Sequence, residues 1–364
     1  MIIVRDKNAP TTIQVTRRLM DGIQLVGGKK QMPQLEIPDD LKLGNSTFNT
    51  LPSYFSNIMP SKLNYLFADC PNLTELPILD FRKVSTHSNW LSNSPVKRVE
   101  GVINASNNLR ALFSGCTSLV SVGKIDTRYV YDFAYMFDGC TSFKRIDDLN
   151  TSNATHMNYM FNGCTLLNHP LKNIEYCGNC DAIYQYSGIM GYNGDLDWPK
   201  ATSLSRAFFD CNLETVGDCD FRSCTTASET FSLNGDLTRV GNIDFRSLNG
   251  ANSNWFRSCD NLETIGDIRL DSFNASNVTV NNSSSSSLKN IGGFTNLGKG
   301  RVGNLELRLN YQKQLTEESV INIGNTIYPN DTEYTRRIRL YSQVRDTLDD
   351  TTIALFTNKG WTIQ

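Results

Sequence analysis

Aromatic and apolar residues recur along the middle of the chain at a nearly constant spacing. One such position per repeat is occupied, in order, by Phe67, Leu91, Phe113, Phe137, Phe161, Tyr184, Phe208, Phe231, Phe256 and Val280. We call these ten residues the anchors, and consecutive anchors are 22 to 25 residues apart. So regular a period is typical of a protein whose units stack on one another, because a single unit cannot bury its own apolar face.

Two further apolar columns keep the register of the anchors and bracket a short extended stretch. The column near the ninth position after the anchor contains Leu76, Val99, Val122, Ile146, Val216, Val240 and Ile265. The column near the twelfth position contains Leu79, Ile103, Ile125, Leu149, Leu196, Ile243 and Ile268. We expect one short parallel strand per repeat at these positions. The segment before each anchor, such as SNATHMNYMF, is expected to form turns or a short helix.

Short polar residues follow each expected strand, near the thirteenth position after the anchor. They are Asp80, Asn104, Asp126, Asn150, Asp197, Asp220 and Asp244. Asp and Asn side chains in turns accept hydrogen bonds from nearby backbone N–H groups. This column is therefore expected to close the turn that leaves each strand.

A cysteine column accompanies the anchors, three positions after six of them. Its members are Cys70, Cys116, Cys140, Cys164, Cys211 and Cys259. A free cysteine packs like a small hydrophobic residue, so we expect this column in the core. The most regular part of the predicted ladder contains Phe113, Phe137 and Phe161 with Cys116, Cys140 and Cys164. Oxidation of the cysteines, or metal binding by them, stays open as the alternative.

Together these columns predict an α/β repeat solenoid with about 24 residues per unit. Residues 47–300 would form the solenoid, and residues 301–364 an α/β cap over its open apolar end. Residues 1–46 lie outside the register and would form an N-terminal cap or an anchoring segment. The serine run 283–287 has the composition of a flexible linker. Because Leu288 and Ile291 resume the apolar pattern directly after it, we expect an ordered turn.

The repeated blocks MFDGCTSF, RIDDLNTSN and YMFNGCTLL resemble the leucine-rich repeats of BspA-like proteins, whose units read roughly MFxGCxSLxxLDLS. The resemblance covers about residues 60–295 and is strongest at residues 113–168. It is specific for a repeat family and says little about function. The pattern decays near Trp90, Tyr184 and Phe231, where irregular stacking is expected.

The C-terminal residues carry a second resemblance. LTEESVINIGNTIYP, RRIRLYS and LDDTTIALFTNKGWTIQ are similar to the terminal cap of such repeats in proteins of gut Bacteroides and their phages. BspA-like bacterial proteins usually carry a secretion signal, whereas MIIVRDKNAP places charge where a signal peptide needs an apolar stretch. The resemblance therefore implies a virion protein of a Bacteroides-type (crAss-like) bacteriophage.

Composition narrows the classes of partner. The formal net charge is −2, which gives no electrostatic reason to expect a nucleic acid as partner. The sequence contains no apolar run of about 18 residues, so we expect no membrane insertion.

A metal or redox site is weakly indicated. Cys177-Gly-Asn-Cys180 is a CxxC sequence, which such a site could use. No second CxxC occurs, and the only histidines are His87, His156 and His169. We therefore expect no metal and no cofactor.

Catalytic motifs are also scarce. The sequence has no GxSxG, HExxH or GxxxxGK[ST] motif. A glycan-cleaving enzyme needs two carboxylates, and the acidic pairs available are Asp195 with Asp197 and Asp147 with Asp148. Asp197 belongs to the polar turn column, so structural roles explain these residues better. We expect that the chain is not an enzyme.

An arginine column is the main candidate for binding. Arg82, Arg128, Arg222 and Arg246 each follow the Asp/Asn column by two positions. Stacked on one face they would be either charges paired with their neighbours or a docking stripe for an acidic partner or a surface sugar. Trp90 and Trp198 lie in irregular columns and are candidates for exposed glycan-stacking or interface positions, with the core as the alternative.

The sequence therefore favours a non-enzymatic virion structural or fibre protein. Its expected partners are other virion proteins and a host-surface polysaccharide or protein receptor, bound by a homo-oligomer with avidity. The alternative is an adhesin or binding module of the bacterial cell surface, and a glycan-cleaving tailspike enzyme is favoured least.

Overall fold

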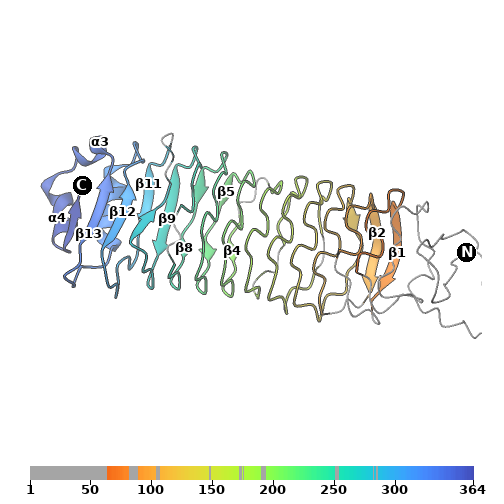
Figure 1. Ribbon diagram of the computed structural model, residues 1–364. Helices are drawn as coiled ribbons and strands as arrows, with labels where there is room; N and C mark the ends of the chain where they lie inside the picture. The colour runs from red at the N-terminus through yellow and green to blue at the C-terminus, as the bar shows by residue number, and fades with distance from the viewer. Residues whose placement is uncertain are drawn as a thin grey trace, which may run out of the picture.

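A computed structural model describes residues 64–364, apart from 82–88, 104–106, 147–148, 172–173, 175, 190–193, 251–253, 282 and 284–285. The chain forms a parallel β-solenoid of about 11 turns with few helices. Figure 1 shows the turns side by side in one elongated stack, from β1 to the C-terminal helices. The prediction of a stacked solenoid with parallel strands is confirmed. The predicted N-terminal segment 1–46 lies outside the described residues.

The N-terminal strands show how each turn buries its apolar columns. β1 (Glu75–Asp80), β2 (Arg98–Ile103) and β3 (Ser121–Val122) form a three-stranded parallel sheet. Leu76 pairs with Val99, and Leu79 with Val102, and all four are at most 2% exposed. The two buried apolar positions of each strand are three residues apart, so the side chains do not alternate strictly, and Ile78 and Glu100 between them are exposed.

Between β3 and β4 the described residues form turns and isolated bridges but no strand, so the expectation of one strand per repeat is not met in these turns. Later turns have short strands again, which are β4 (Leu196–Asp197), β5 (Thr215–Val216), β6 (Cys219–Asp220), β7 (Arg239–Val240), β8 (Ile243–Asp244), β9 (Thr264–Arg269) and β11 (Asn290–Gly293). β9 is a single strand that pairs with β7 near its start and with β8 near its end. In the preceding turns the same stretch is divided into two strands of two residues each, β5 with β6 and β7 with β8. A Cβ atom added at Gly241 would lie 2.4 Å from the Asp218 Oδ1 atom, so the close approach of the turns requires glycine at this interruption.

A second parallel ladder runs along the segments that precede the anchors. Isolated parallel bridges join Asn108, Asp132, His156, Asn179, Ser203 and Thr226 in sequence. These segments consist of turns, and the described residues form α-helix only within residues 317–357. The sequence left open whether the segments before the anchors form turns or a short helix, and those that the structure describes form turns.

Each of the nine anchors from Phe67 to Phe256 lies in a tight bend with left-handed backbone on both sides. Two residues before an anchor, φ is positive at Tyr65, Asn89, Ala111, Tyr135, Tyr159, Ala182, Arg206, Glu229 and Asn254. Two residues after it, φ is positive at Asp69, Asn93, Gly115, Gly139, Gly163, Tyr186, Asp210, Leu233 and Ser258. These angles lie between 51° and 73°, where a residue other than glycine costs about 1–2 kcal/mol. The glycine of the Phe-x-Gly-Cys blocks removes that cost from one of the two positions.

The anchors from Phe113 to Phe256 form a continuous stack of rings through the core. Ring centroids are 5.4 Å apart for Phe113 and Phe137, 5.5 Å for Phe137 and Phe161, and 5.5 Å for Phe161 and Tyr184. The stack continues through Phe208 to Phe231 with a spacing of 5.4 Å. The anchors are at most 1% exposed, so their burial supplies much of the hydrophobic stabilisation.

One column assignment from the sequence is wrong. Val102, and not Ile103, occupies the buried position beside Leu79, while Ile103 pairs with Asp80 and is 45% exposed. The shift is possible because both residues are apolar and the spacing between the anchors Leu91 and Phe113 is 22 residues. Ile103 thus occupies the position that Asp80 and Asp126 fill in the neighbouring turns.

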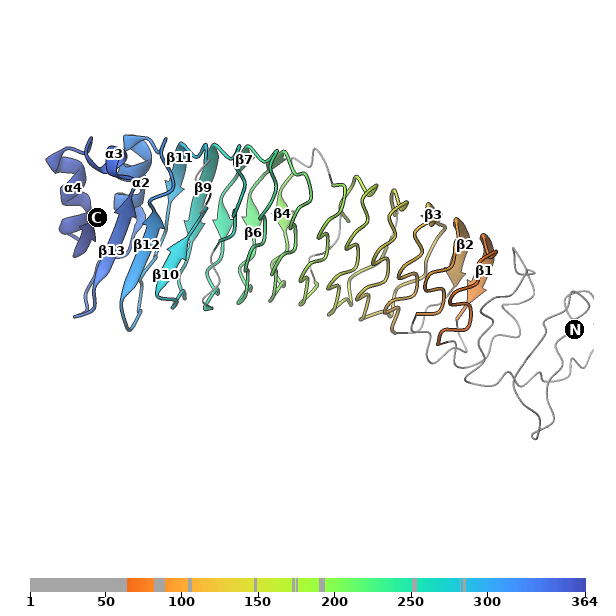
Figure 2. The same cartoon turned by 45° about the horizontal axis from the view of Figure 1, so that its top comes forward.

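The C-terminal residues add a four-stranded parallel sheet and the helices. The strands are β10 (Asn277–Thr279), β12 (Leu305–Leu309), β13 (Arg336–Leu340) and β14 (Trp361–Ile363), and the helices are α2 (Glu317–Thr326), α3 (Ser342–Arg345) and α4 (Asp350–Thr357). Figure 2 shows the helices gathered at this end of the stack. The Thr316 side chain accepts a hydrogen bond from the Ser319 amide, and Asp349 does the same for Thr352, so both residues cap a helix N-terminus. Leu288 and Ile291, after the serine run, are buried as their register predicts.

Candidate functional site

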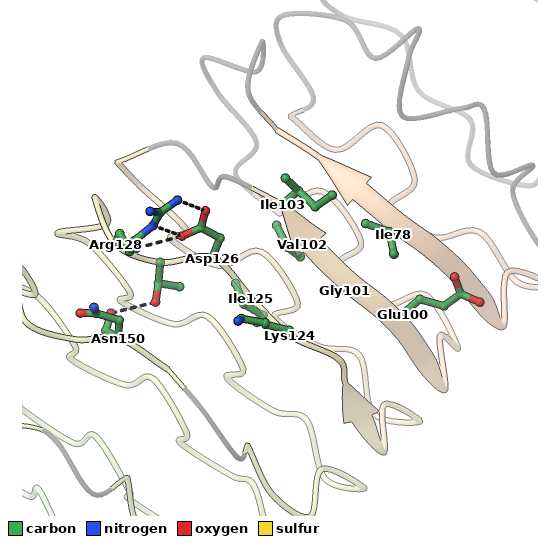
Figure 3. A pocket seen from close by; sticks show the side chains of 11 residues that line it. Ile78, Glu100, Gly101, Val102, Ile103, Lys124, Ile125, Asp126, Arg128 and Asn150 are labelled. Carbon is green, nitrogen blue, oxygen red and sulfur yellow. Dashed lines mark hydrogen bonds and ion pairs between the residues drawn. The ribbon is translucent and has the colours of Figure 1, made fainter.

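A groove of about 650 Å³ opens on the outer face of β1 and β2. Figure 3 shows Ile78 and Ile103 on neighbouring strands, with Glu100 and Lys124 on one side and Asp126 with Arg128 on another. The groove extends to Asn150 in a following turn. It therefore spans several units of the stack, and no single unit contains it.

The floor of the groove is backbone, because Gly101 lies between Ile78 and Lys124. Ile78 pairs directly with Gly101. A Cβ atom on Gly101 would lie 2.9 Å from the Lys124 carbonyl oxygen, so the neighbouring turn leaves no space for a side chain. The groove therefore lies over the close backbone contact between Gly101 and Lys124.

Two isoleucines give the groove an apolar surface. Ile78 is 46% exposed and Ile103 is 45% exposed. Both belong to the outward-facing rows of adjacent strands, diagonal to one another in the sheet register. Together they form a small apolar surface that is rimmed by the charged side chains of Glu100, Lys124, Asp126 and Arg128.

The polar rim is organised by an ion pair. The Arg128 guanidinium donates from Nε and Nη2 to the two carboxylate oxygens of Asp126, at 3.0 Å each. These hydrogen bonds hold the pKa of the Asp126 carboxyl below its ordinary value. The Thr127 hydroxyl donates to the Asn150 carbonyl at 2.8 Å and fixes the rim to the next turn. The rim therefore presents a fixed, internally neutralised pair of charges.

The other arginines of the predicted stripe repeat this pairing. Arg222 Nε donates to Asp220 at 2.8 Å, and Arg246 Nε donates to Asp244 at 3.0 Å. The backbone amide two residues later also donates a hydrogen bond to the side chain of this column. The acceptors are the carboxylates of Asp126, Asp220 and Asp244 and the amide oxygen of Asn150. Arg82 lies outside the described residues. Each described arginine of the stripe thus forms an ion pair with the aspartate two residues before it. A role of the stripe in binding stays a prediction.

The tryptophans do not lie on the exposed face, which corrects the assignment of Trp90 and Trp198 as surface binding residues. Trp90 is fully buried, with its ring 5.3 Å from Phe67 and 5.4 Å from Phe81. Trp198 is 4% exposed, and its ring lies 5.2 Å from Phe208. Both indoles therefore belong to the aromatic core.

The cysteines are buried free thiols. Burial raises the pKa of Cys140 and Cys180 well above the ordinary value and that of Cys116 to about 12. A thiol that stays protonated is a poor nucleophile and a poor metal ligand. Cys177 donates to the Asn179 carbonyl at 3.2 Å, so the CxxC sequence forms part of the core. Within the described residues, no three His, Cys, Asp or Glu side chains are grouped so as to hold a metal ion.

The carboxylates considered for catalysis are spread along the turns. Asp195 Oδ1 accepts the Asp218 amide at 2.9 Å, which ties one turn to the next. Asp197 is exposed at the end of β4, and Asp147 and Asp148 lie outside the described residues. His156 is exposed, with its Nδ1 atom 2.9 Å from the Thr155 hydroxyl. In the described part of the chain, no helix is both long and apolar enough to span a bilayer.

Sequence reasoning missed the groove because it placed Ile103 in the core. The segment VEGVIN shows only the ambiguity, because the adjacent apolar residues Val102 and Ile103 compete for one buried position. Gly101 directly before them marks the strand position that lacks a side chain.

The fold and groove define a class of protein: a repeat β-solenoid whose outer strand face carries a recessed apolar site. The DUF285 family, described as a Mycoplasma protein of unknown function, matches residues 107–212. This match and the β-solenoid fit a BspA-like repeat protein. Neither a curated protein nor a solved structure matches the chain.

Proposed function

We propose that the chain is a non-enzymatic binding protein whose groove receives an apolar side chain of a protein partner. The observation that carries the proposal is the exposure of Ile78 and Ile103 over the backbone floor at Gly101. Each isoleucine is nearly half exposed, so covering it completely contributes about half of the roughly 1.5–3 kcal/mol that full burial of such a side chain provides. The stacked core beneath holds the groove in place, so little conformational entropy is lost on binding.

The rim favours a partner with polar or charged groups around an apolar centre. Glu100 and Lys124 offer one charge of each sign, and Arg128 is already engaged by Asp126. Such a rim favours one orientation of the bound partner more than it increases the affinity for it. We therefore assign the groove to a protein surface and not to an acidic polymer.

The repeating unit belongs to the same proposal: we infer a unit of about 24 residues closed by a C-terminal α/β cap. Hydrogen bonds between equivalent side chains support the unit, such as that from Asn162 to Asp138, 24 residues earlier, at 2.7 Å. The sheet β10–β12–β13–β14 and helix α2 support the cap, because Leu307, Ile338 and Ile323 are fully buried at this end of the stack.

The setting we propose is a virion of a Bacteroides-type bacteriophage, where the chain would be a structural or fibre component. This placement rests on the resemblance of the C-terminal segment to caps of phage proteins. The groove would bind another virion protein, and repeated copies in a homo-oligomer would give avidity towards a host-surface receptor. An adhesin of the bacterial cell surface is the alternative, because a rigid binding solenoid suits either setting.

Replacing Ile103 by Asp tests the groove. Asp80 and Asp126 occupy the same column in adjacent turns, so Ile103→Asp is compatible with the fold and removes the apolar surface. We expect the variant to keep the melting temperature of the wild-type chain and to lose incorporation into gradient-purified phage particles, measured by quantitative mass spectrometry.

Val120→Asp is the matched control, since Val120 is 40% exposed and lies outside the groove. We expect it to incorporate like the wild-type chain. Equal incorporation of Ile103→Asp would refute the role of the groove. Recovery of the wild-type chain in bacterial envelopes, with none in particles, would favour the adhesin.

A further inference from the structure

The outer face of the C-terminal sheet carries two polar rows across neighbouring strands. In one row Thr279 pairs with Arg308, and Arg308 with Arg339. In the other, two residues earlier on each strand, Asn277 pairs with Glu306, and Glu306 with Arg337. The residues between the rows, Val278, Leu307 and Ile338, are fully buried. Because side chains alternate along a strand, both rows face away from the core.

A single carboxylate holds two of the guanidinium groups. Glu306 Oε2 lies 3.1 Å from Arg339 Nε, and Glu306 Oε1 accepts a hydrogen bond from Arg308 Nε at 2.5 Å. Each guanidinium has five N–H donors. Because the contact with Glu306 is made through Nε, the terminal nitrogens remain donors for a ligand or solvent. The carboxylate thus orients the two arginines as a pair.

The charges on this face do not cancel. Arg308, Arg337 and Arg339 face one acidic side chain, Glu306, in these rows, although the whole chain has a formal net charge of −2. This differs from the arginine stripe, in which Arg128, for example, has its own aspartate. The surplus of positive charge favours a negatively charged ligand.

A cavity of about 440 Å³ lies beside the oriented arginines. Apart from Arg308 and Arg339, its lining consists of Asn254, Asn277, Thr279, Asn310 and Tyr311. The volume lies within the range of about 300–1,000 Å³ that is typical of small-ligand sites. Amides and hydroxyls both donate and accept hydrogen bonds, so the lining suits a ligand with many hydroxyl groups and one anionic group.

We propose that this cavity binds a carboxylate-bearing sugar unit of an acidic polysaccharide. The guanidinium pair matches the two oxygens of a carboxylate, and the asparagine and threonine side chains match the sugar hydroxyls. Tyr311, 39% exposed, offers an aromatic face beside them. The inference rests on the proposed binding function and names the class of host-surface ligand, at the opposite end of the stack from the groove.

Calorimetric titration of the full chain with digalacturonate at low salt tests the site. We expect binding by the wild-type chain, no binding of the neutral galactose disaccharide, and affinities lower by about tenfold or more in Arg308→Gln and Arg339→Gln, because each substitution removes a charge-assisted hydrogen bond. Arg345→Gln is the matched control: Arg345 is exposed and pairs with Asp346 outside the cavity. It removes the same charge and should leave the affinity unchanged.

The variant Glu306→Gln distinguishes the positioning of the two arginines from the net positive charge of this face. It makes the face more positive and releases the guanidinium pair, so we expect weaker binding. Tighter binding by Glu306→Gln, or an equal loss in Arg345→Gln, would overturn the site as a positioned one. A glutamate-rich peptide that binds as tightly as digalacturonate would overturn the sugar assignment.

Absence of binding by the wild-type chain refutes this inference alone. The groove variant Ile103→Asp reports separately, through particle incorporation, on the proposed function. The two failures are therefore distinguishable.

Discussion

The Cys140 thiol donates a hydrogen bond to the backbone carbonyl of Phe113, 27 residues earlier, with Sγ and O 3.0 Å apart. The same bond joins Cys164 to Phe137 and Cys211 to Tyr184. The cysteine column therefore does more than fill space. Each thiol satisfies a buried carbonyl of the preceding anchor, at a position where water has no access.

Turns that lack the cysteine keep a donor in its place. The Ser94 hydroxyl donates to the Phe67 carbonyl at 2.5 Å, and the Asn234 amide donates to the Phe208 carbonyl at 2.7 Å. These two turns keep the hydrogen bond while changing the residue that makes it, whereas Ser187 at the same position donates to the Cys211 sulfur. A small side chain with a donor is what this position requires.

We predict that Cys140→Ala is less stable than Cys140→Ser by about 1 kcal/mol, the net contribution of a buried hydrogen bond. The serine hydroxyl can replace the thiol, as Ser94 shows, whereas alanine cannot donate. The Phe113 carbonyl also accepts the Cys116 amide, which limits the loss. Urea unfolding followed by circular dichroism measures the difference. Equal stability of the two variants would show that the thiol acts by packing alone.

Gly139 should be required for its backbone conformation. Its φ is +71°, and an added Cβ would meet nothing closer than 3.8 Å, so Gly139→Ala isolates the strain of the left-handed region. We expect a loss of about 1–2 kcal/mol in the free energy of unfolding. Gly235 has open space around it and no left-handed φ, and Gly235→Ala should change stability by less than about 0.5 kcal/mol. A similar loss in both variants would contradict the conformational explanation.

Alkaline pH should destabilise the fold through the buried thiols. Burial raises the pKa of Cys116 from 9.0 to about 12, so the folded chain keeps the proton at a pH where the unfolded chain loses it. Stability is intact below pH 9 and falls as pH rises towards 12, by up to about 1.4 kcal/mol per pH unit for each such thiol. Unfolding free energies measured from pH 8 to 11 should therefore fall less steeply for Cys116→Ser than for the wild-type chain. Parallel profiles would contradict this prediction.

Acid titration should report the ion pair between Arg269 and Asp271. Hydrogen bonds from Arg269 lower the pKa of Asp271 from 3.8 to about 2, so the stabilisation is present above pH 3.8 and is lost as pH falls towards 2. Carboxyl carbon NMR shifts should place the Asp271 titration near 2 in the wild-type chain and at a higher pH in Arg269→Gln, which keeps the hydrogen bond from Asn296. Arg246→Gln, which removes the partner of Asp244 instead, should leave Asp271 near 2. A wild-type titration at 3.8 would contradict the pairing.

Parallel stacking followed from the sequence, because the anchors and the two apolar columns repeat with a nearly fixed period. That period is a local signal, and it requires neighbouring units to bury what each unit cannot bury alone. The groove did not follow, since one buried position beside Leu79 could take either Val102 or Ile103. The choice depends on pairing with the turns before and after, which the local sequence does not encode.

Sequence alone determined that Phe113, Phe137 and Phe161 form equivalent positions, because equivalence is a matter of spacing. Only the tertiary structure decided what surrounds each position: that Trp90 fills the core, that Cys140 meets the carbonyl of Phe113, and that Glu306 lies between Arg308 and Arg339. Cys140 and Phe113 are 27 residues apart, and Glu306 and Arg339 are 33 apart. Such contacts form when stacking brings separate turns within about 5 Å of one another, and burial then selects which side chains face inward.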